Sequence, residues 1–173
     1  MSGRCAERRL RVIGVGCRWA GDDGVGPAVV DALASEGLTG ADGVHAGIDA
    51  HLARDVAELV DLLAPDRRLV IVDAARVEPA GRVLDVPLDA LARPPAGALS
   101  AHGAGVAEAV GLARALHEGD GLDVRVIAVT VGHRLASGEG LSPVVAVAVQ
   151  DVVERIRVLA AAGPALDGPG AGG

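Results

Sequence analysis

Two aspartates and one histidine from distant parts of the chain could together hold a divalent metal ion. Asp23 follows the first apolar run, Asp73 comes near the end of the run LVIVDA, and His102 begins a segment with helical spacing. Two carboxylates and an imidazole suit a cation of borderline softness, such as nickel, zinc, iron or manganese, and leave room for water or substrate ligands. A plainer interpretation uses the same residues structurally: Asp22 or Asp23 caps the helix near Pro27, Asp73 braces a loop, and His102 only starts a helix.

The elements that position these residues are predicted from apolar runs alternating with helically spaced segments. We expect strands at 10–16, 44–47, 69–74, 82–87 and 124–132, and helices at 27–33, 51–63, 102–117 and after Ser142-Pro143. The run 69–74 is apolar apart from Asp73, and the run 124–132 is mostly apolar, which is typical of parallel strands buried on both faces. The prediction is an α/β fold: a single-domain three-layer sandwich, with a mostly parallel twisted sheet of about five strands and helices on both faces.

This fold predicts where the chemistry lies. Residues 1–162 form one domain in this interpretation, and residues 163–173 form a flexible tail of Gly, Pro and Ala. In parallel sheets of this kind, ligands bind beyond the carboxyl ends of the strands. We therefore expect Asp23, Asp73 and His102 to meet there.

Composition excludes several classes of function. The chain has 173 residues, with 16 basic and 23 acidic side chains and a net charge of −7, and its one aromatic residue is Trp19. Nucleic-acid binding is not expected, because it relies on basic surfaces and stacking aromatics. No apolar run reaches the roughly 18–20 residues of a membrane span. The cysteines, Cys5 and Cys17, are too few for a disulfide scaffold, and without the apolar stretch of a signal peptide the expected location is the cytoplasm.

Two rival sites fail on the same segment. A dinucleotide fingerprint needs a third glycine where this chain has Trp19, and Asp22 and Asp23 would repel a pyrophosphate. A phospho-acceptor receiver domain would use an acidic pair and an aspartate such as Asp73, but it pairs the phosphoryl group with a lysine. The chain contains no lysine, which also excludes a P-loop.

Four segments resemble the [NiFe]-hydrogenase maturation endopeptidases. They are VIGVGCRWAGDDGVGPAVVDAL at 12–33, LVIVDA at 69–74, Ser100-Ala101-His102, and GLSPVV at 140–145. They occur in the order found in that family and span most of residues 10–157, with weaker matches at 38–67 and 76–99.

The resemblance implies a nickel-contacting triad of Asp23, Asp73 and His102, in which Asp23 and Asp73 are also catalytic. The nickel is supplied by the hydrogenase large-subunit precursor, whose C-terminal peptide the family removes; zinc or cadmium could occupy the site in vitro. A carboxylate coupled to the metal could activate water, or the two aspartates could work as an aspartic-type pair. The expected enzyme is a monomer. The alternative function is a non-catalytic nickel-sensing or chaperone-like module.

Three residues are candidates for substrate binding. Cys17 stands where the family usually has asparagine, as a harmless small residue in our interpretation; a lost substrate hydrogen bond or an extra soft ligand are the alternatives. Gly47 keeps one glycine of the turn expected after the second strand. Trp19, in the loop before the acidic pair, could contact the partner or simply cover the cleft.

Overall fold

The computed structural model describes residues 9–40, 47–92, 101–117, 121–132 and 140–162, without the side chains of residues 91, 92 and 101–104. The expected tail at 163–173 lies outside the described residues. In chain order the elements are β1 (Leu10–Val15), η1 (Gly21–Gly24), α1 (Val25–Ser35), β2 (Ile48–Ala53), α2 (Val56–Leu62), β3 (Arg68–Ala75), β4 (Val83–Val86), α3 (Leu88–Ala92), α4 (Ala101–Leu116), β5 (Asp123–Thr130) and α5 (Pro143–Ala161).

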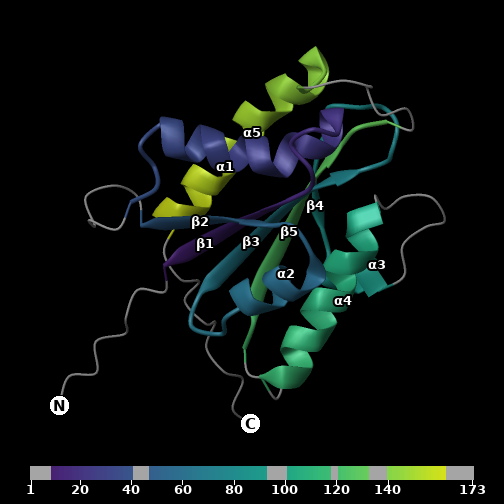
Figure 1. Cartoon of the computed structure of the whole chain (residues 1–173). Coiled ribbons are helices and arrows are strands. Elements are labelled where there is room, and N and C mark those ends of the chain that lie inside the picture. The colour runs from purple at the N-terminus through teal and green to yellow at the C-terminus, as the bar shows by residue number, and fades with distance from the viewer. Residues whose placement is uncertain (1–8, 41–46, 93–100, 118–120, 133–139, 163–173) are drawn as a thin grey trace, which may run out of the picture.

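The strands form one five-stranded sheet in the order β2-β1-β3-β5-β4 (Figure 1). β1, β2, β3 and β5 run parallel, and β4 pairs antiparallel with β5 at one border. β3 is buried from Leu69 to Ala75, as expected for a strand covered on both faces. We call the end of the sheet where the four parallel strands finish its carboxyl end, and the opposite one its amino end.

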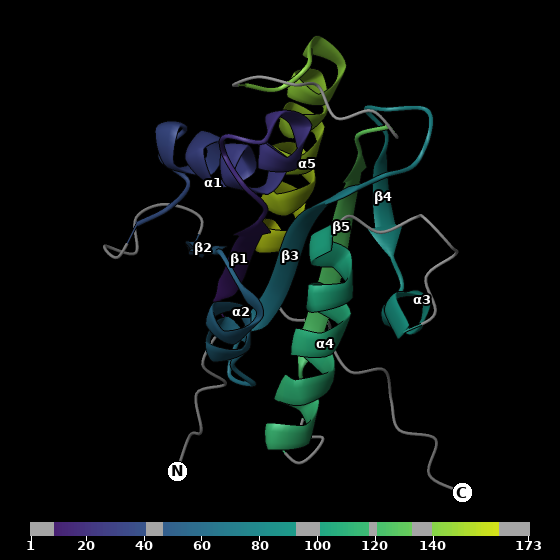
Figure 2. The ribbon, with the colours of Figure 1, turned by 45° about the vertical axis from the view of Figure 1, so that its right-hand side comes forward.

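Helices cover both faces of the sheet, which confirms the predicted three-layer α/β architecture. Figure 2 shows α1 and α5 on one side and α2 and α4 on the other. Alternate residues of the strands supply the two cores. Val70 and Val72 of β3 pack with α1 and α5, whereas Leu69 and Ile71 pack with α2 and α4. Among the described helices, none has the length and apolarity needed to cross a bilayer.

The second strand and second helix differ from the prediction. His51 lies within β2, not at the start of a helix, and the helix begins only at Val56. The capping residue sets this boundary, because the Asp55 carboxylate accepts the backbone N–H of Glu58 at 2.9 Å. The apolar residues before Asp55 continue the helical spacing by coincidence, and so the predicted helix extends too far back.

Candidate active site

Close backbone packing fixes the chain that follows β1. A β-carbon on Gly26 would lie 2.3 Å from the carbonyl oxygen of Val15 and 2.7 Å from that of Val72. A β-carbon on Gly14 would lie 2.5 Å from the Gly26 carbonyl oxygen. Only glycine permits this approach. The first turn of α1 therefore rests directly on β1 and β3, and the preceding turn, η1, lies at the carboxyl end of the sheet.

Asp23 lies in η1 with its carboxylate held from the neighbouring loop. The residue is 5% exposed, and its Oδ2 accepts the backbone N–H of Cys17 at 3.0 Å. Gly16 has a φ of +126°, and a β-carbon there would lie 2.1 Å from the Asp23 carbonyl oxygen. The Gly16-Cys17 segment thus wraps closely around Asp23 and orients its side chain.

Asp73 lies near the end of β3 and is also 5% exposed. Residues two apart in a strand share a face, so the side chain of Asp73 points to the same face as those of Leu69 and Ile71, which is the face covered by α2 and α4. Its Oδ1 accepts the backbone N–H of Ala74 at 2.8 Å. A carboxylate buried beside apolar side chains is costly to desolvate, and the hydrogen bond from the N–H of Ala74 offsets part of this cost.

His102 is the second residue of α4. This helix leads into β5, which runs toward the carboxyl end, so α4 begins at that end (Figure 2). A cavity of about 250 Å³ confirms the placement, because Gly105 of α4 and Val15 at the end of β1 both line it. The side chain of His102 lies outside the description. Among the described side chains no group of three or more His, Cys, Asp and Glu could hold a metal, so the triad stays a prediction.

The three candidate substrate-binding residues are placed differently. Cys17 is exposed beside Asp23, and Trp19, in the same loop, is 71% exposed. Gly47 does not follow the second strand as expected. It directly precedes Ile48, the first residue of β2, and lines a cavity of about 300 Å³ with Arg9 and others at the amino end of the sheet. That expectation is wrong because β2 lies several residues later in the chain than predicted.

The structure assigns Asp22 a contact that sequence reasoning missed. Asp22 is 3% exposed, and its Oδ1 accepts the backbone N–H of Ser142 at 2.6 Å, across 120 residues of sequence. Neither Asp22 nor Asp23 caps α1, whose N-cap is Gly24 with no side-chain hydrogen bond. The capping interpretation of the acidic pair is therefore wrong.

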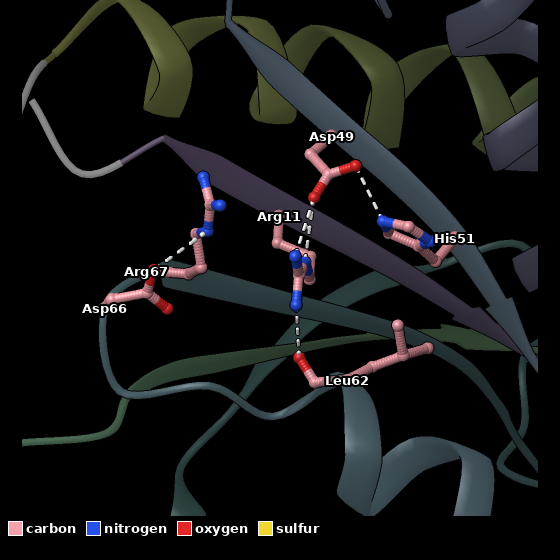
Figure 3. Close-up of polar contacts among 6 residues, drawn as sticks. All are labelled: Arg11, Asp49, His51, Leu62, Asp66 and Arg67. Carbon is pink, nitrogen blue, oxygen red and sulfur yellow. Dashed lines mark hydrogen bonds and ion pairs between the residues drawn. The ribbon is translucent and has the colours of Figure 1, made fainter. Parts of the chain in front are cut away.

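A second polar cluster has a structural role (Figure 3). Arg11 of β1 donates to the Asp49 carboxylate at 2.9 Å and to the carbonyl of Leu62, the last residue of α2, at 3.0 Å. His51 Nε2 lies 2.6 Å from the other Asp49 oxygen. The cluster fastens the border strand β2 to β1 and α2.

The pH dependence of stability should report this cluster. Burial raises the pKa of Asp49, but the hydrogen bond from Arg11 and the pairing with His51 outweigh burial and hold this pKa below its ordinary value of 3.8. Asp49 therefore stabilises the fold above pH 3.8, and this contribution is lost as the pH falls through the lower, folded-state pKa. In urea unfolding, we expect the free-energy difference between the wild type and Asp49→Asn to shrink from pH 7 to pH 3. A difference that stays constant would contradict this.

Solved structures of hydrogenase maturation proteases resemble this chain. HybD from Thermococcus kodakarensis superposes with a TM-score of 0.68 at 24% identity, over 88% of this chain and 99% of that one. HybD from E. coli superposes with a TM-score of 0.65 at 22% identity, over 86% of this chain and 89% of that one. The protease HycI from Thermococcus kodakarensis KOD1 superposes with a TM-score of 0.64 at 19% identity, over 91% of this chain and 95% of that one.

The chain has the fold of the hydrogenase maturation proteases. This agrees with the resemblance seen in the four sequence segments and extends it across nearly the whole length of the similar structures. No family model and no curated protein matches the sequence. The likeness is thus one of backbone architecture, and the chemistry has to be argued from the side chains at the carboxyl end of the sheet.

Proposed function

We propose that this chain is an endopeptidase that removes the C-terminal peptide from a nickel-loaded precursor of a nickel-iron hydrogenase large subunit. The observation that carries the proposal is the pair of buried aspartates, Asp23 and Asp73, at the carboxyl end of the sheet. The chain around them has the fold of hydrogenase maturation proteases. The first turn of α4, which contains His102, begins at the same end.

These residue types suit a nickel ion that arrives with the substrate. The carboxylates of Asp23 and Asp73 are hard oxygen donors and the imidazole of His102 is a donor of borderline softness, and such a mixed set can share a nickel ion with thiolates of the precursor. The ion would identify a loaded precursor and set the scissile peptide beside the two acids. Zinc or cadmium should occupy the same ligands in vitro.

Two mechanisms of water activation use this arrangement. In the first, a carboxylate that contacts the ion also takes a proton from the attacking water. In the second, Asp23 and Asp73 act as an aspartic-type pair and the nickel serves only recognition. Both mechanisms require both aspartates, and they differ in whether metal binding and cleavage are lost together.

A non-catalytic nickel-sensing module is the second candidate function. The observation in its favour is the exposed thiol-bearing residue Cys17, whose backbone N–H already contacts Asp23. A thiol is a soft donor that could add to nickel affinity without aiding hydrolysis. In either function we propose that the protein acts as a monomer in the cytoplasm, with no nucleic-acid or membrane partner.

Intact-mass measurement of the precursor tests the proposal. We expect the pure protein to shorten a nickel-loaded large-subunit precursor once, at its C-terminus, and to leave the nickel-free precursor uncut. Binding of the loaded precursor with no change of mass would reject the endopeptidase in favour of the sensing module. Equal cutting of loaded and nickel-free precursor would reject nickel recognition.

A further inference from the structure

The acidic pair in η1 has two carboxylates with different partners. Asp22 accepts the N–H of Ser142 at 2.6 Å, whereas Asp23 accepts the N–H of Cys17 at 3.0 Å. A 3₁₀ turn has three residues per turn, so neighbouring side chains diverge by about 120°. One carboxylate therefore reaches toward α5 and the other toward the loop after β1.

Backbone and side-chain hydrogen bonds together hold the short turn η1. It spans four residues; the N–H of Asp23 donates to the carbonyl of Ala20 at 3.3 Å, and the N–H of Val25 donates to the carbonyl of Asp22. A short hydrogen bond to a carboxylate is roughly twice as strong as one between neutral groups. The bond from Ser142 to Asp22 is of this kind, and its acceptor residue is buried, so it contributes to placing the turn.

On the α5 side, the contact uses only the backbone of Ser142. Ser142 is the N-cap of α5, with a φ of −61° and a ψ of 152°, and its hydroxyl makes no capping bond. That hydroxyl is buried and has no hydrogen-bond partner within the described part of the chain. The N–H that Ser142 donates to Asp22 thus lies at the start of a helix that packs against α1.

We propose that Asp22 is a positioning residue for the reaction. It ties η1 to the first residue before α5 and thereby holds Asp23 where substrate is bound. The inference rests on the proposed function for the reaction itself, but the positioning step concerns only the chain's own contacts. It also joins two of the sequence segments, the acidic pair and the GLSP turn, into one structural unit.

Four variants test this tie from both partners. Asp22→Ala removes the acceptor, and Asp22→Asn keeps an acceptor oxygen without the charge. Ser142→Pro removes the N–H, and the observed φ of −61° already suits proline. Ser142→Ala keeps the N–H and so separates loss of the hydroxyl from loss of the donor.

Amide hydrogen exchange at Cys17 reads the position of Asp23 without any activity assay. We expect the Cys17 N–H to exchange about tenfold faster or more in Asp22→Ala and in Ser142→Pro, and Asp22→Asn to lie between these and the wild type. Unchanged Cys17 exchange in Asp22→Ala, with the Ser142 N–H released, would overturn the proposal. If Asp22→Ala fails to fold, Ser142→Pro tests the same bond.

Precursor cleavage supplies the functional measurement. We expect kcat/KM to fall roughly 10- to 100-fold in Asp22→Ala and Ser142→Pro, with substantial recovery in Asp22→Asn. The control is Asp49→Ala, which removes a partly buried carboxylate at the amino end of the sheet and should cleave at the wild-type rate. Equal cleavage by Asp22→Ala and the wild type would overturn the proposal. No cleavage by the wild type would reject the proposed function, while the exchange result would still decide the positioning role.

Discussion

Asp23→Asn is expected to lower kcat/KM for precursor cleavage by on the order of 10²-fold or more, because a general base typically contributes 10²- to 10⁴-fold. The amide keeps the size of the side chain and an oxygen that can accept the Cys17 N–H. The fold should therefore persist while the charge and the proton acceptor are lost. Asp73→Asn should have an effect of the same order, measured by intact mass against time.

A matched control and a metal titration sharpen this test. Asp151→Asn makes the same change on an exposed acid in the middle of α5 and should leave cleavage intact. Calorimetric titration with Cd²⁺ separates the two mechanisms. If Asp23→Asn loses both cleavage and Cd²⁺ binding, Asp23 is a metal ligand. If it loses cleavage but still binds Cd²⁺, the result supports the aspartic-type pair. Wild-type cleavage by Asp23→Asn would contradict both.

Gly26→Ala is expected to destabilise the fold by about 3 kcal/mol or more, or to prevent folding. The added methyl group would meet backbone atoms of two central strands, 2.3 Å from the Val15 oxygen and 2.7 Å from the Val72 oxygen. Backbone cannot rotate aside as a flexible side chain does, so relieving the clash must separate α1 from the sheet. Urea unfolding followed by far-ultraviolet circular dichroism measures the loss.

The chain offers a control of opposite sign. Gly111 lies in α4 with open space where a β-carbon would be added. Gly111→Ala should raise the free energy of unfolding by up to about 1 kcal/mol, since alanine is the better helix former. If Gly26→Ala unfolded within about 1 kcal/mol of the wild type, the close packing of α1 on the sheet would not be a constraint on the site.

The central strands could be predicted because burial on both faces leaves mostly apolar residues. The expected strands at 69–74 and 124–132 correspond to β3 and β5. The border strand β2 could not be read in the same way. It does alternate apolar and polar residues from Ile48 to Leu52, with Asp49 and His51 in the polar cluster, but Leu52 also fits the helical spacing of the segment that follows.

The candidate site was predictable to the extent that it depends on strand ends. Asp23 and Asp73 follow or end apolar runs, and the parallel topology brings those ends together. The contact of Asp22 was not predictable, because its partner is a backbone N–H 120 residues away. Every residue except proline carries such a donor, so no residue type in the sequence marks it.

Trp19 has a consequence for spectroscopy. It is the one tryptophan of a chain without tyrosine, and it is 71% exposed in the loop that leads to Asp23. Its fluorescence should therefore change little when the protein denatures, since the indole is in water before and after. In the proposed function, a precursor that covered this loop would shift the emission to shorter wavelength. The indole would then report partner binding optically while staying insensitive to unfolding of the interior.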